Sequence, residues 1–548
     1  MKHIIWFLIL FISPYFSICQ NTVGLVSYNK SKSHDGYTLI FPHNQSNVYL
    51  INTCGEIVHS WPDSTIWRPG NTAYITKEGK LIKAKRDRIV VGNPIWFGGG
   101  GAIVEIRDWN NNLEWSYEIN DSTKRMHHDI SIMPNGNILI LVWNKKTQTE
   151  LIAAGRDTSK FKNDVLHSEI ILEVNPKTNT IVWQWDLWDH IIQDYDATKP
   201  NFGVVSQHPE KIDINFPWIQ DGSWFHINAI DYNAELDQII VSVPTYNEFW
   251  ILDHTTTTQQ AKGSTGGFGG AGGDLIYRWG NAATYKKGST SDQKSFYQHG
   301  VHWATSFLPP TYPDYGKIVF FNNRAGNDFS QVNLISPPWD MYEWKYTKTN
   351  GIWGPTNYDK TIKHPIPTKL YSDILSNAQL LPNGNTLILA GRSGYILELT
   401  PDNQIVWEYI VPLKNGISAN QGEILSINDN TNFRANRYPL NYEGFQGKDL
   451  SPKGFIEKSP NAGYCNKLVS TFDSDKFQEI DIYPNPSREK VRIRVNKALD
   501  LEIISLDGKI QRKIQLHEGL NEINISELEN GIYLFQSSNG YVKSFIKI

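Results

Sequence analysis

The feature that most constrains the fold of this chain is an apolar strand with tryptophan at or near its end, which recurs along most of the sequence. The six tryptophans lie 54, 68, 96, 65 and 63 residues apart, at Trp61, Trp115, Trp183, Trp279, Trp344 and Trp407. A β-propeller blade is a four-stranded sheet of about 40–50 residues, so each interval can hold one blade with loop insertions. The repeat therefore predicts an all-β fold, a six-bladed β-propeller, with a pair of β-sandwiches as the alternative.

The two ends of the repeat are expected to share one blade. The first unit, from Tyr37 to Trp61, is too short for a complete four-stranded sheet. The stretch QGEILSINDNTNFRANRYP, which follows the last unit and ends at Pro439, carries one more strand-like run. Because an open ring would leave sheet edges unpaired, we expect this C-terminal strand to complete the first blade and close the ring.

The first 19 residues have the pattern of a signal peptide. An apolar run from Ile4 to Ile12 follows one lysine and is too short to span a bilayer. We expect cleavage before Gln20; a lipoprotein site at Cys19 is the weaker alternative, because the bulky Ile18 precedes it. No later segment reaches the length of a membrane-spanning helix, so the sequence predicts no transmembrane segment.

Charge and cysteine usage exclude several classes of function. The formal net charge is −4 and no Lys/Arg cluster is interleaved with aromatic residues, which argues against nucleic acid as a partner. Two cysteines, Cys54 and Cys465, lie near the ends of the main domain predicted for residues 20–465. A disulfide between them and two unpaired thiols both fit. The lack of a CxxC pair argues against thiolate metal sites and dithiol redox chemistry.

The composition changes after Cys465, with an expected linker at 466–478 and short alternating strands from 479 to 548. Four pieces of this segment, IYPNP, LDGK, NGIYLF and a final KI, resemble the C-terminal sorting domain of the type IX secretion system of Bacteroidetes. The resemblance implies a small β-sandwich with no part in catalysis. It also implies the type IX secretion machinery as a partner, and a protein that is secreted or attached to the outer surface after periplasmic transit.

Polar residues recur at one register position of the predicted blades. His128 lies seven residues before the turn asparagine Asn135 in HHDISIMPNGN, and the same offset selects Asn71, His226 and Ser376 in three other blades. The fifth blade has a longer turn, which leaves His299 and His302 as its candidates. Innermost strands begin at the mouth of the central channel, so these residues should converge there. Asn228 joins them, because residues two apart on a strand share a face.

Three converging histidines fit two kinds of chemistry. Neutral imidazoles are good ligands for zinc or copper, and a metal-dependent hydrolase or lyase would need such an ion. A neutral imidazole is also a nucleophile, and donors around it can hold an anionic sulfate or phosphate group. By strand alternation His127 and Asp129 should point away from the channel, so we expect no carboxylate among the histidines and no bound metal.

The same residues belong to longer motifs that resemble the bacterial arylsulfate sulfotransferases, in a Bacteroidetes branch of that family. These motifs span roughly Leu25 to Asn432: HHDISIMPNGN, HINAIDYN, a long block at 247–281, QHGVHW and GKIVFFNN. The resemblance implies a propeller that moves a sulfuryl group from a small phenolic sulfate donor to a phenol acceptor, without a nucleotide sulfate donor or other cofactor. It assigns His299 as the nucleophile, which forms a sulfohistidine, with His128, His226 and Asn228 as donors to the sulfuryl and phenolic oxygens.

One departure from the family pattern concerns an arginine that follows the HxN strand. Here the corresponding stretch reads IIVSVPTYNEFW, with Pro244 at the arginine position. Arg324 or Arg392 could reach the site from another blade, and we count Arg324, Asn71, Ser376 and His302 as substrate-binding candidates. The alternative function is a non-catalytic secreted propeller that binds glycans or protein through its aromatic-rich loops.

Overall fold

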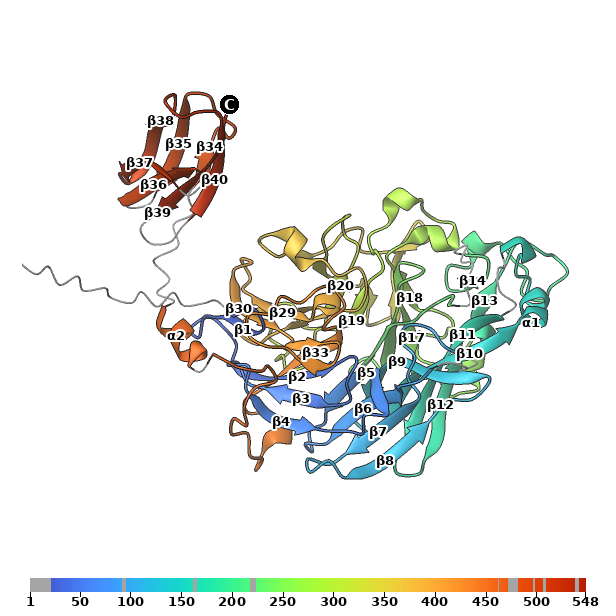
Figure 1. The fold of residues 1–548 in the computed structure, drawn as a ribbon. Coiled ribbons are helices and arrows are strands. Elements are labelled where there is room, and N and C mark those ends of the chain that lie inside the picture. Colours follow the sequence, from blue (N-terminus) through green and yellow to red (C-terminus); the bar gives the residue numbers. More distant parts are fainter. Residues whose placement is uncertain are drawn as a thin grey trace, which may run out of the picture. The chain divides into compact units, whose positions relative to one another are not determined.

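The computed structural model describes residues 21–90, 95–160, 165–216, 223–461, 463–471, 481–495, 498–505, 509–537 and 542–548. The expected signal peptide and residues 472–478 of the expected linker lie outside these ranges. The chain forms two compact units, residues 1–469 and 470–548 (Figure 1). Among the described residues, no helix combines the length and apolar character needed to cross a membrane.

Within the described residues, six antiparallel sheets of four or five strands build the larger unit. The first sheet has the strand order β33 (Asn432–Pro439), β2 (Gly36–Pro42), β3 (Val48–Ile51), β4 (Ile57–Trp61). The second has the order β5 (Trp67–Ile75), β6 (Leu81–Asp87), β7 (Ile103–Arg107), β8 (Leu113–Glu118). The next two are β9 (Lys124–Ile132), β10 (Ile138–Thr147), β11 (Val165–Asn175), β12 (Thr180–Asp186), and β15 (Ala229–Asn233), β16 (Gln238–Val243), β17 (Glu248–Asp253), β18 (Tyr277–Trp279). The last two are β19 (His299–Trp303), β20 (Ile318–Asn322), β21 (Gln331–Ile335), β26 (Lys360–Ile362), and β27 (Asn377–Leu380), β28 (Thr386–Ala390), β29 (Tyr395–Leu399), β30 (Ile405–Ile410), β1 (Gly24–Tyr28).

The first-named strands of the six sheets contact one another in a closed cycle. β33 contacts β5, and the cycle continues through β9, β15, β19 and β27 back to β33. The strand expected to close the ring does so, since β33 pairs with β2 through the partners Thr38 and Arg437. Figure 1 shows the orange β33 beside the blue strands β2 and β3. β33 therefore gives β2 a partner and completes the first sheet to four strands, whereas an unclosed ring would leave the edge of β2 unpaired.

The tryptophan repeat marks the outer strands in most sheets but not in all. Trp61 and Trp279, for example, lie on the fourth strands β4 and β18. Trp344 departs from the prediction, because it lies between the short strands β22 (Trp339–Asp340) and β23 (Lys345–Tyr346). An inserted hairpin interrupts this sheet, and its fourth strand is the later β26.

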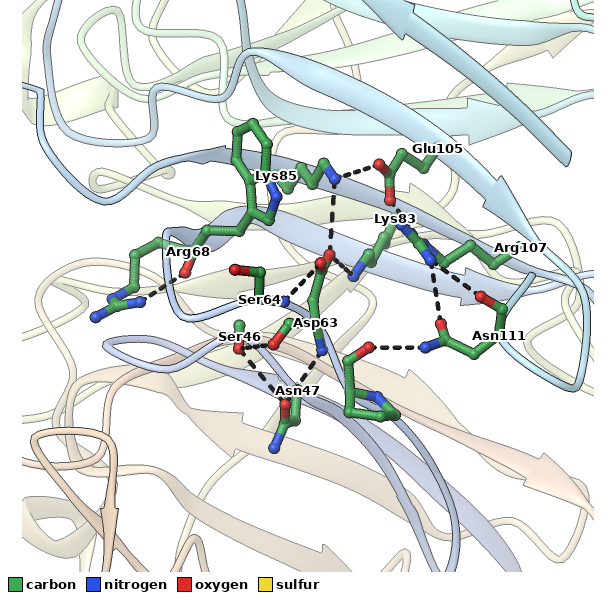
Figure 2. A network of polar contacts seen from close by, with 12 residues as sticks. Ser46, Asn47, Asp63, Ser64, Arg68, Lys83, Lys85, Glu105, Arg107 and Asn111 are labelled. Carbon is green, nitrogen blue, oxygen red and sulfur yellow. Dashed lines mark hydrogen bonds and ion pairs between the residues drawn. The ribbon is translucent and has the colours of Figure 1, made fainter. Parts of the chain in front are cut away.

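A buried network of charges links the first two sheets (Figure 2). Asp63 lies between two lysines, with its Oδ2 atom 2.7 Å from Lys83 Nζ and 3.7 Å from Lys85 Nζ, and Lys85 also pairs with Glu105. Burial alone would raise the pKa of Asp63, but the hydrogen bond and the charge of Lys83 lower it. Lys83 is fully buried, so removal of Asp63 would leave an unpaired charge in the interior.

A disulfide joins Cys54 to Cys465, with a Cα–Cα distance of 5.4 Å and a sequence separation of 411. Of the two alternatives left by the sequence, the structure therefore has the bonded one. Cys54 lies between β3 and β4, and Cys465 lies in α2 (Tyr464–Thr471). The bond ties the end of the larger unit to its first sheet.

The second unit contains two antiparallel sheets among its described residues. One is β34 (Asp481–Tyr483), β35 (Lys490–Val495), β38 (Gly519–Asn524), and the other β37 (Ile510–Leu516), β36 (Leu499–Ser505), β39 (Gly531–Ser537), β40 (Val542–Lys547). Both sheets contribute to one buried cluster, which includes Val491, Ile493, Leu501, Phe535 and Phe545. The larger unit also carries the helix α1 (Gln148–Ala153) and the short strand pairs β13 (Ile191–Ile192) with β14 (Ile212–Asp213), β24 (Lys348–Thr349) with β25 (Ile352–Trp353), and β31 (Leu413–Lys414) with β32 (Ile417–Ser418).

Candidate active site

The register position selected from the sequence has an unusual backbone conformation. Asn71, His128, His226 and Ser376 have φ angles of 93°, 48°, 54° and 90°. Left-handed backbone is rare for residues other than glycine and costs of order 1–3 kcal/mol, and it occurs most often where function requires it. The regular pairing of β9 also shifts register between Met126 and Ile130. These distortions turn side chains out of the simple alternation of a strand.

His128, His226 and His299 come together. The rings of His128 and His226 meet edge to face with their centroids 4.5 Å apart. His128 and His299 are each 3% exposed. Burial lowers the pKa of His226 to about 4 and that of His299 to about 3, and nearby histidine charges add to the burial that lowers the pKa of His128. All three imidazoles are therefore neutral near pH 7.

The hydrogen bonds of His299 select one tautomer. Its Nδ1 lies 2.9 Å from Asn323 Oδ1 and 3.2 Å from the Tyr297 carbonyl oxygen. The Asn323 amide nitrogen donates to the carbonyl oxygens of Ser372 and Leu375, so its oxygen must face the histidine. Because both partners of Nδ1 accept, Nδ1 carries the proton and Nε2 has the lone pair. Nε2 accepts a hydrogen bond from the Leu375 N–H at 3.2 Å.

His128 is supported by His127, whose ring contacts it directly. The two Nδ1 atoms are 2.9 Å apart, and His127 Nε2 lies 2.7 Å from Glu169 Oε2. The His127 ring also stacks on Trp143 with a centroid distance of 4.4 Å. The prediction that His127 points away from the channel gave no indication of its hydrogen bond to Glu169, which is 42 residues away in sequence.

Asp129 does not point away as strand alternation predicts. Its carboxylate accepts a hydrogen bond from Tyr74 Oη at 2.8 Å and pairs with Arg434. Both partners line a cavity at the centre of the ring. The left-handed residue His128 and the register shift around it break the two-residue period, so that prediction is wrong.

The side chains of three other selected residues, Asn228, Asn71 and Ser376, form hydrogen bonds with main-chain groups near the histidines. The Asn228 amide nitrogen donates to the Gln298 carbonyl oxygen, next to His299, and its Oδ1 atom has no hydrogen-bond partner among the described residues. Asn71 Nδ2 donates to the Gly99 carbonyl oxygen at 2.6 Å, which the His128 N–H also reaches. Ser376 Oγ accepts from the Gly391 N–H. These three side chains therefore stabilise the backbone segments that surround the histidines.

Residues 23–431 match the family model described as Arylsulfotransferase (ASST). The chain belongs to the arylsulfotransferase family. Residues 481–548 match the model of the secretion system C-terminal sorting domain. The protein is therefore secreted or held on the outer surface, with the type IX secretion machinery as its partner. No curated protein matches this arylsulfotransferase.

Solved structures that align with this arylsulfotransferase do so weakly. A protein of unknown function from Bacteroides caccae has 12% identity and a TM-score of 0.38, covering 69% of this chain and 94% of its own. Virginiamycin B lyase from Staphylococcus aureus has 12% identity and a TM-score of 0.32, covering 72% and 90%. The periplasmic gluconolactonase of Pseudomonas aeruginosa has 8% identity and a TM-score of 0.35, covering 73% and 99%. Scores this low carry no argument about function.

The two arginines considered as substitutes in this arylsulfotransferase differ in their surroundings. The Arg324 guanidinium lies over the Tyr297 ring, 3.9 Å from its centroid, and its charge contributes to the lowered pKa of His299. The guanidinium of Arg392 is bound by Asp373 at 2.5 Å and by Asn428. Arg324 is therefore the better placed of the two.

One cavity of the arylsulfotransferase has a lining that does not include the three histidines. It has a volume of about 1140 Å³ and is lined by His302, Asp231 and Arg434, together with the turn residues Asn135 and Gly136. His302 lines this cavity and His299 does not, although both were candidates of the fifth blade from the sequence. Burial raises the pKa of Asp231 to about 7, and Arg434 Nε has no hydrogen-bond partner among the described residues.

Several residues of the site were not selected from the sequence. Asn323 is the last residue of the motif GKIVFFNN. The pair of asparagines that follows the apolar strand in this motif was the sequence feature that could have identified it. Arg434 lies on the predicted closing strand, within FRANRYP. Glu169 had no signal of its own, because it meets the histidines only when β11 pairs with β10.

Proposed function

We propose that the six sheets form a six-bladed β-propeller and that its histidine cluster transfers sulfuryl groups between phenols. The observation that carries this proposal is the fixed tautomer of a neutral, buried His299, whose Nε2 carries the lone pair and accepts a hydrogen bond of 3.2 Å from the Leu375 N–H. An unprotonated imidazole nitrogen is the form that can attack sulfur. Two further neutral histidines lie beside it.

The reaction proceeds in two displacements at sulfur. His299 Nε2 attacks the sulfur of the aryl sulfate, the sulfur–oxygen ester bond breaks, and the first phenol leaves with a proton. The oxygen of the acceptor phenol then attacks the sulfohistidine, the sulfur–nitrogen bond breaks, and the acceptor loses its proton. Donors placed around the transferring group stabilise the charge that builds up on it.

Four groups supply such donors in the proposal. His226 Nδ1 lies 2.7 Å from Ser223 Oγ, which leaves Nε2 to face the cluster, and His128 lies beside it. The Leu375 N–H already meets His299 Nε2 and is placed for a sulfuryl oxygen. Arg324 supplies the positive charge that the family arginine would give, since Pro244 occupies that position.

Turnover of 4-nitrophenyl sulfate with a phenol acceptor tests the proposal. We expect ping-pong kinetics from the wild-type protein and no turnover from His299→Ala. His208→Gln, at a surface histidine paired with Glu210, serves as the matched control and keeps full activity. Arg324→Ala should lose about 10²–10³-fold in kcat/KM, and undiminished turnover would remove its role.

The rival proposal is a non-catalytic propeller that binds glycans or protein. Exposed aromatic residues such as Phe268 and Tyr342 favour it. A folded protein that binds a glycan array but leaves several aryl sulfates intact would decide for the rival. We also propose that the second unit is a β-sandwich joined by a linker at 466–478, as the domain boundaries from the sequence state.

A further inference from the structure

A buried carboxyl group is connected to the site through two histidines in series. Glu169 and His127 are both 0% exposed. Glu169 Oε2 lies 2.7 Å from His127 Nε2, and His127 Nδ1 lies 2.9 Å from His128 Nδ1. Both nitrogens of His127 are therefore engaged, one toward the acid and one toward the site. The second carboxyl oxygen, Oε1, accepts a hydrogen bond from the Ile227 N–H.

Each of these contacts holds one hydrogen, and the direction of one fixes the direction of the next. If Glu169 is protonated, it donates to His127 Nε2, His127 Nδ1 donates to His128 Nδ1, and His128 keeps its proton on Nε2. If Glu169 is a carboxylate, both bonds reverse and His128 Nε2 carries a lone pair. The two arrangements differ by one proton, and neither contains a charged imidazole ring.

The surroundings favour the protonated carboxyl in the resting protein. Burial raises the pKa of Glu169 well above its usual range and lowers the pKa of His127 and of His128 well below theirs. The ring of His127 stacks on Trp143, which also packs against His167, a further buried histidine with a pKa lowered to about 4. The hydrogen bonds of Glu169 thus run to a neutral ring and to a backbone N–H.

We propose that Glu169 stores the proton that the first phenol takes and the second phenol returns, and that His127 and His128 pass it. This inference rests on the proposed sulfuryl transfer. When the ester bond breaks, His128 Nε2 gives its proton to the phenolate oxygen, His127 gives the Nδ1 proton to His128, and Glu169 protonates His127 Nε2. When the acceptor phenol attacks, its proton enters at His128 Nε2 and the same steps run in reverse.

This relay supplies what a neutral His128 lacks by itself. A neutral imidazole that loses its N–H proton with no replacement would become an anion, which is a poor outcome in a buried site. With the relay, the negative charge that develops ends on the Glu169 carboxylate, behind two rings. His128 is the residue that touches the phenolic oxygen, and Glu169 and His127 are positioning residues that act through it.

Glu169→Gln separates this role from a structural one. A glutamine amide can donate to His127 Nε2 and accept from the Ile227 N–H, so it keeps both hydrogen bonds of a protonated Glu169 but cannot release a proton. The test compares kcat/KM for 4-nitrophenyl sulfate, whose phenolate leaves easily, with kcat/KM for phenyl sulfate, whose phenolate needs a proton. Glu173→Gln, on the same strand and outside the cluster, is the matched control.

We expect Glu169→Gln to lose about 10²–10⁴-fold on phenyl sulfate, the usual contribution of a general acid, and less than tenfold on 4-nitrophenyl sulfate. His127→Gln should show the same selective loss. Equal loss on both donors, or no loss on either, would overturn the relay. The control should match the wild type on both donors.

An infrared measurement gives a readout that does not depend on turnover. The infrared difference spectrum between the folded wild-type protein and Glu169→Gln at pH 7 should contain the carbonyl stretch of one protonated carboxyl, because the contribution of Asp231, with its pKa of about 7, is common to both proteins and cancels. Absence of this band from the difference spectrum would overturn the relay whatever the activity. A protein that shows the band but turns over no aryl sulfate would overturn the proposed sulfuryl transfer, and with it the transfer of the proton to a phenol. The protonated state of Glu169 would still be established in that case.

Discussion

Replacement of Asn323 by alanine tests whether the tautomer of His299 matters for activity. The substitution removes the acceptor that lies 2.9 Å from His299 Nδ1. It also removes two donations, to the carbonyl oxygens of Ser372 and Leu375, at 2.7 and 2.9 Å. The Tyr297 carbonyl oxygen at 3.2 Å and the Leu375 N–H remain as weaker determinants of the same tautomer.

The size of the effect follows from these contacts. A neutral hydrogen bond contributes about 0.5–1.5 kcal/mol net, and 1.36 kcal/mol corresponds to a tenfold change in rate. The lost acceptor alone therefore accounts for up to about tenfold. Loosening of the segment at Leu375 adds to this, because a shift of about 1 Å in a reacting group can cost about 100-fold. We expect kcat/KM to fall between about 10- and 100-fold in Asn323→Ala.

The assay is release of 4-nitrophenol in the presence of a saturating phenol acceptor, with folding checked by near-UV circular dichroism. The pH profile should keep its shape between pH 6 and 9, because loss of the Asn323 hydrogen bond lowers the pKa of His299 further from about 3 and leaves it neutral. A folded Asn323→Ala protein with undiminished turnover would refute the argument that this amide sets the reactive nitrogen.

Three other perturbations have defined outcomes. Gly99 has a φ of 92°, and a Cβ atom at this position would lie 1.9 Å from His128 Nε2. Gly99→Ala should therefore lower both the activity and the urea midpoint of unfolding. Unchanged values would contradict this, because they would show that the loop moves to accommodate the methyl group at no cost. Cys54→Ser opens the long disulfide loop and should lower the free energy of unfolding by about 2–5 kcal/mol, measured by urea denaturation under oxidising conditions, and equal midpoints would contradict this. Burial would lower the pKa of His254, but its hydrogen bonds to Asp237 and Glu173 raise this pKa to about 9. The contribution of His254 to stability is therefore full below pH 6.5 and is lost as the pH rises through about 9. A His254→Gln protein should lack this part of the pH dependence of the thermal midpoint.

The position of the histidines was predictable because it follows from a local pattern. The offset of seven residues from the turn asparagine found His128 and His226, since both innermost strands reach the centre in the same left-handed conformation. The same rule applied to Asn71 and Ser376, which have positive φ as well. Closure of the ring by β33 was also predictable, because the short first unit lacks a fourth strand and the sequence after the last unit supplies one more.

Two uncertainties at the site have a common physical cause, a local break in a strand. Strand alternation misplaced Asp129 because the residue before it is left-handed and the strand shifts register there. The longer turn of the fifth blade left both His299 and His302 as candidates, and their strand shifts register between the two. Trp344 has a different cause: it was counted as one unit of the strand repeat, but it lies between the two strands of an inserted hairpin.

Partners far apart in sequence could not be predicted from local patterns. Asn323 reaches His299 from the neighbouring strand of its sheet, and Glu169 reaches His127 across 42 residues. Arg434 pairs with Asp129 across 305 residues, because the closing strand β33 comes within reach of β9 only in the folded ring. These contacts are products of the tertiary fold.

The measurement that tests the central claim most directly is mass spectrometry of the purified protein after mixing with 4-nitrophenyl sulfate and no acceptor. The account predicts one added sulfuryl group, located on the peptide that contains His299, together with release of one equivalent of nitrophenol. His299→Ala should show neither. A folded wild-type protein that shows no adduct and no release with several aryl sulfates would contradict the account and favour a binding propeller.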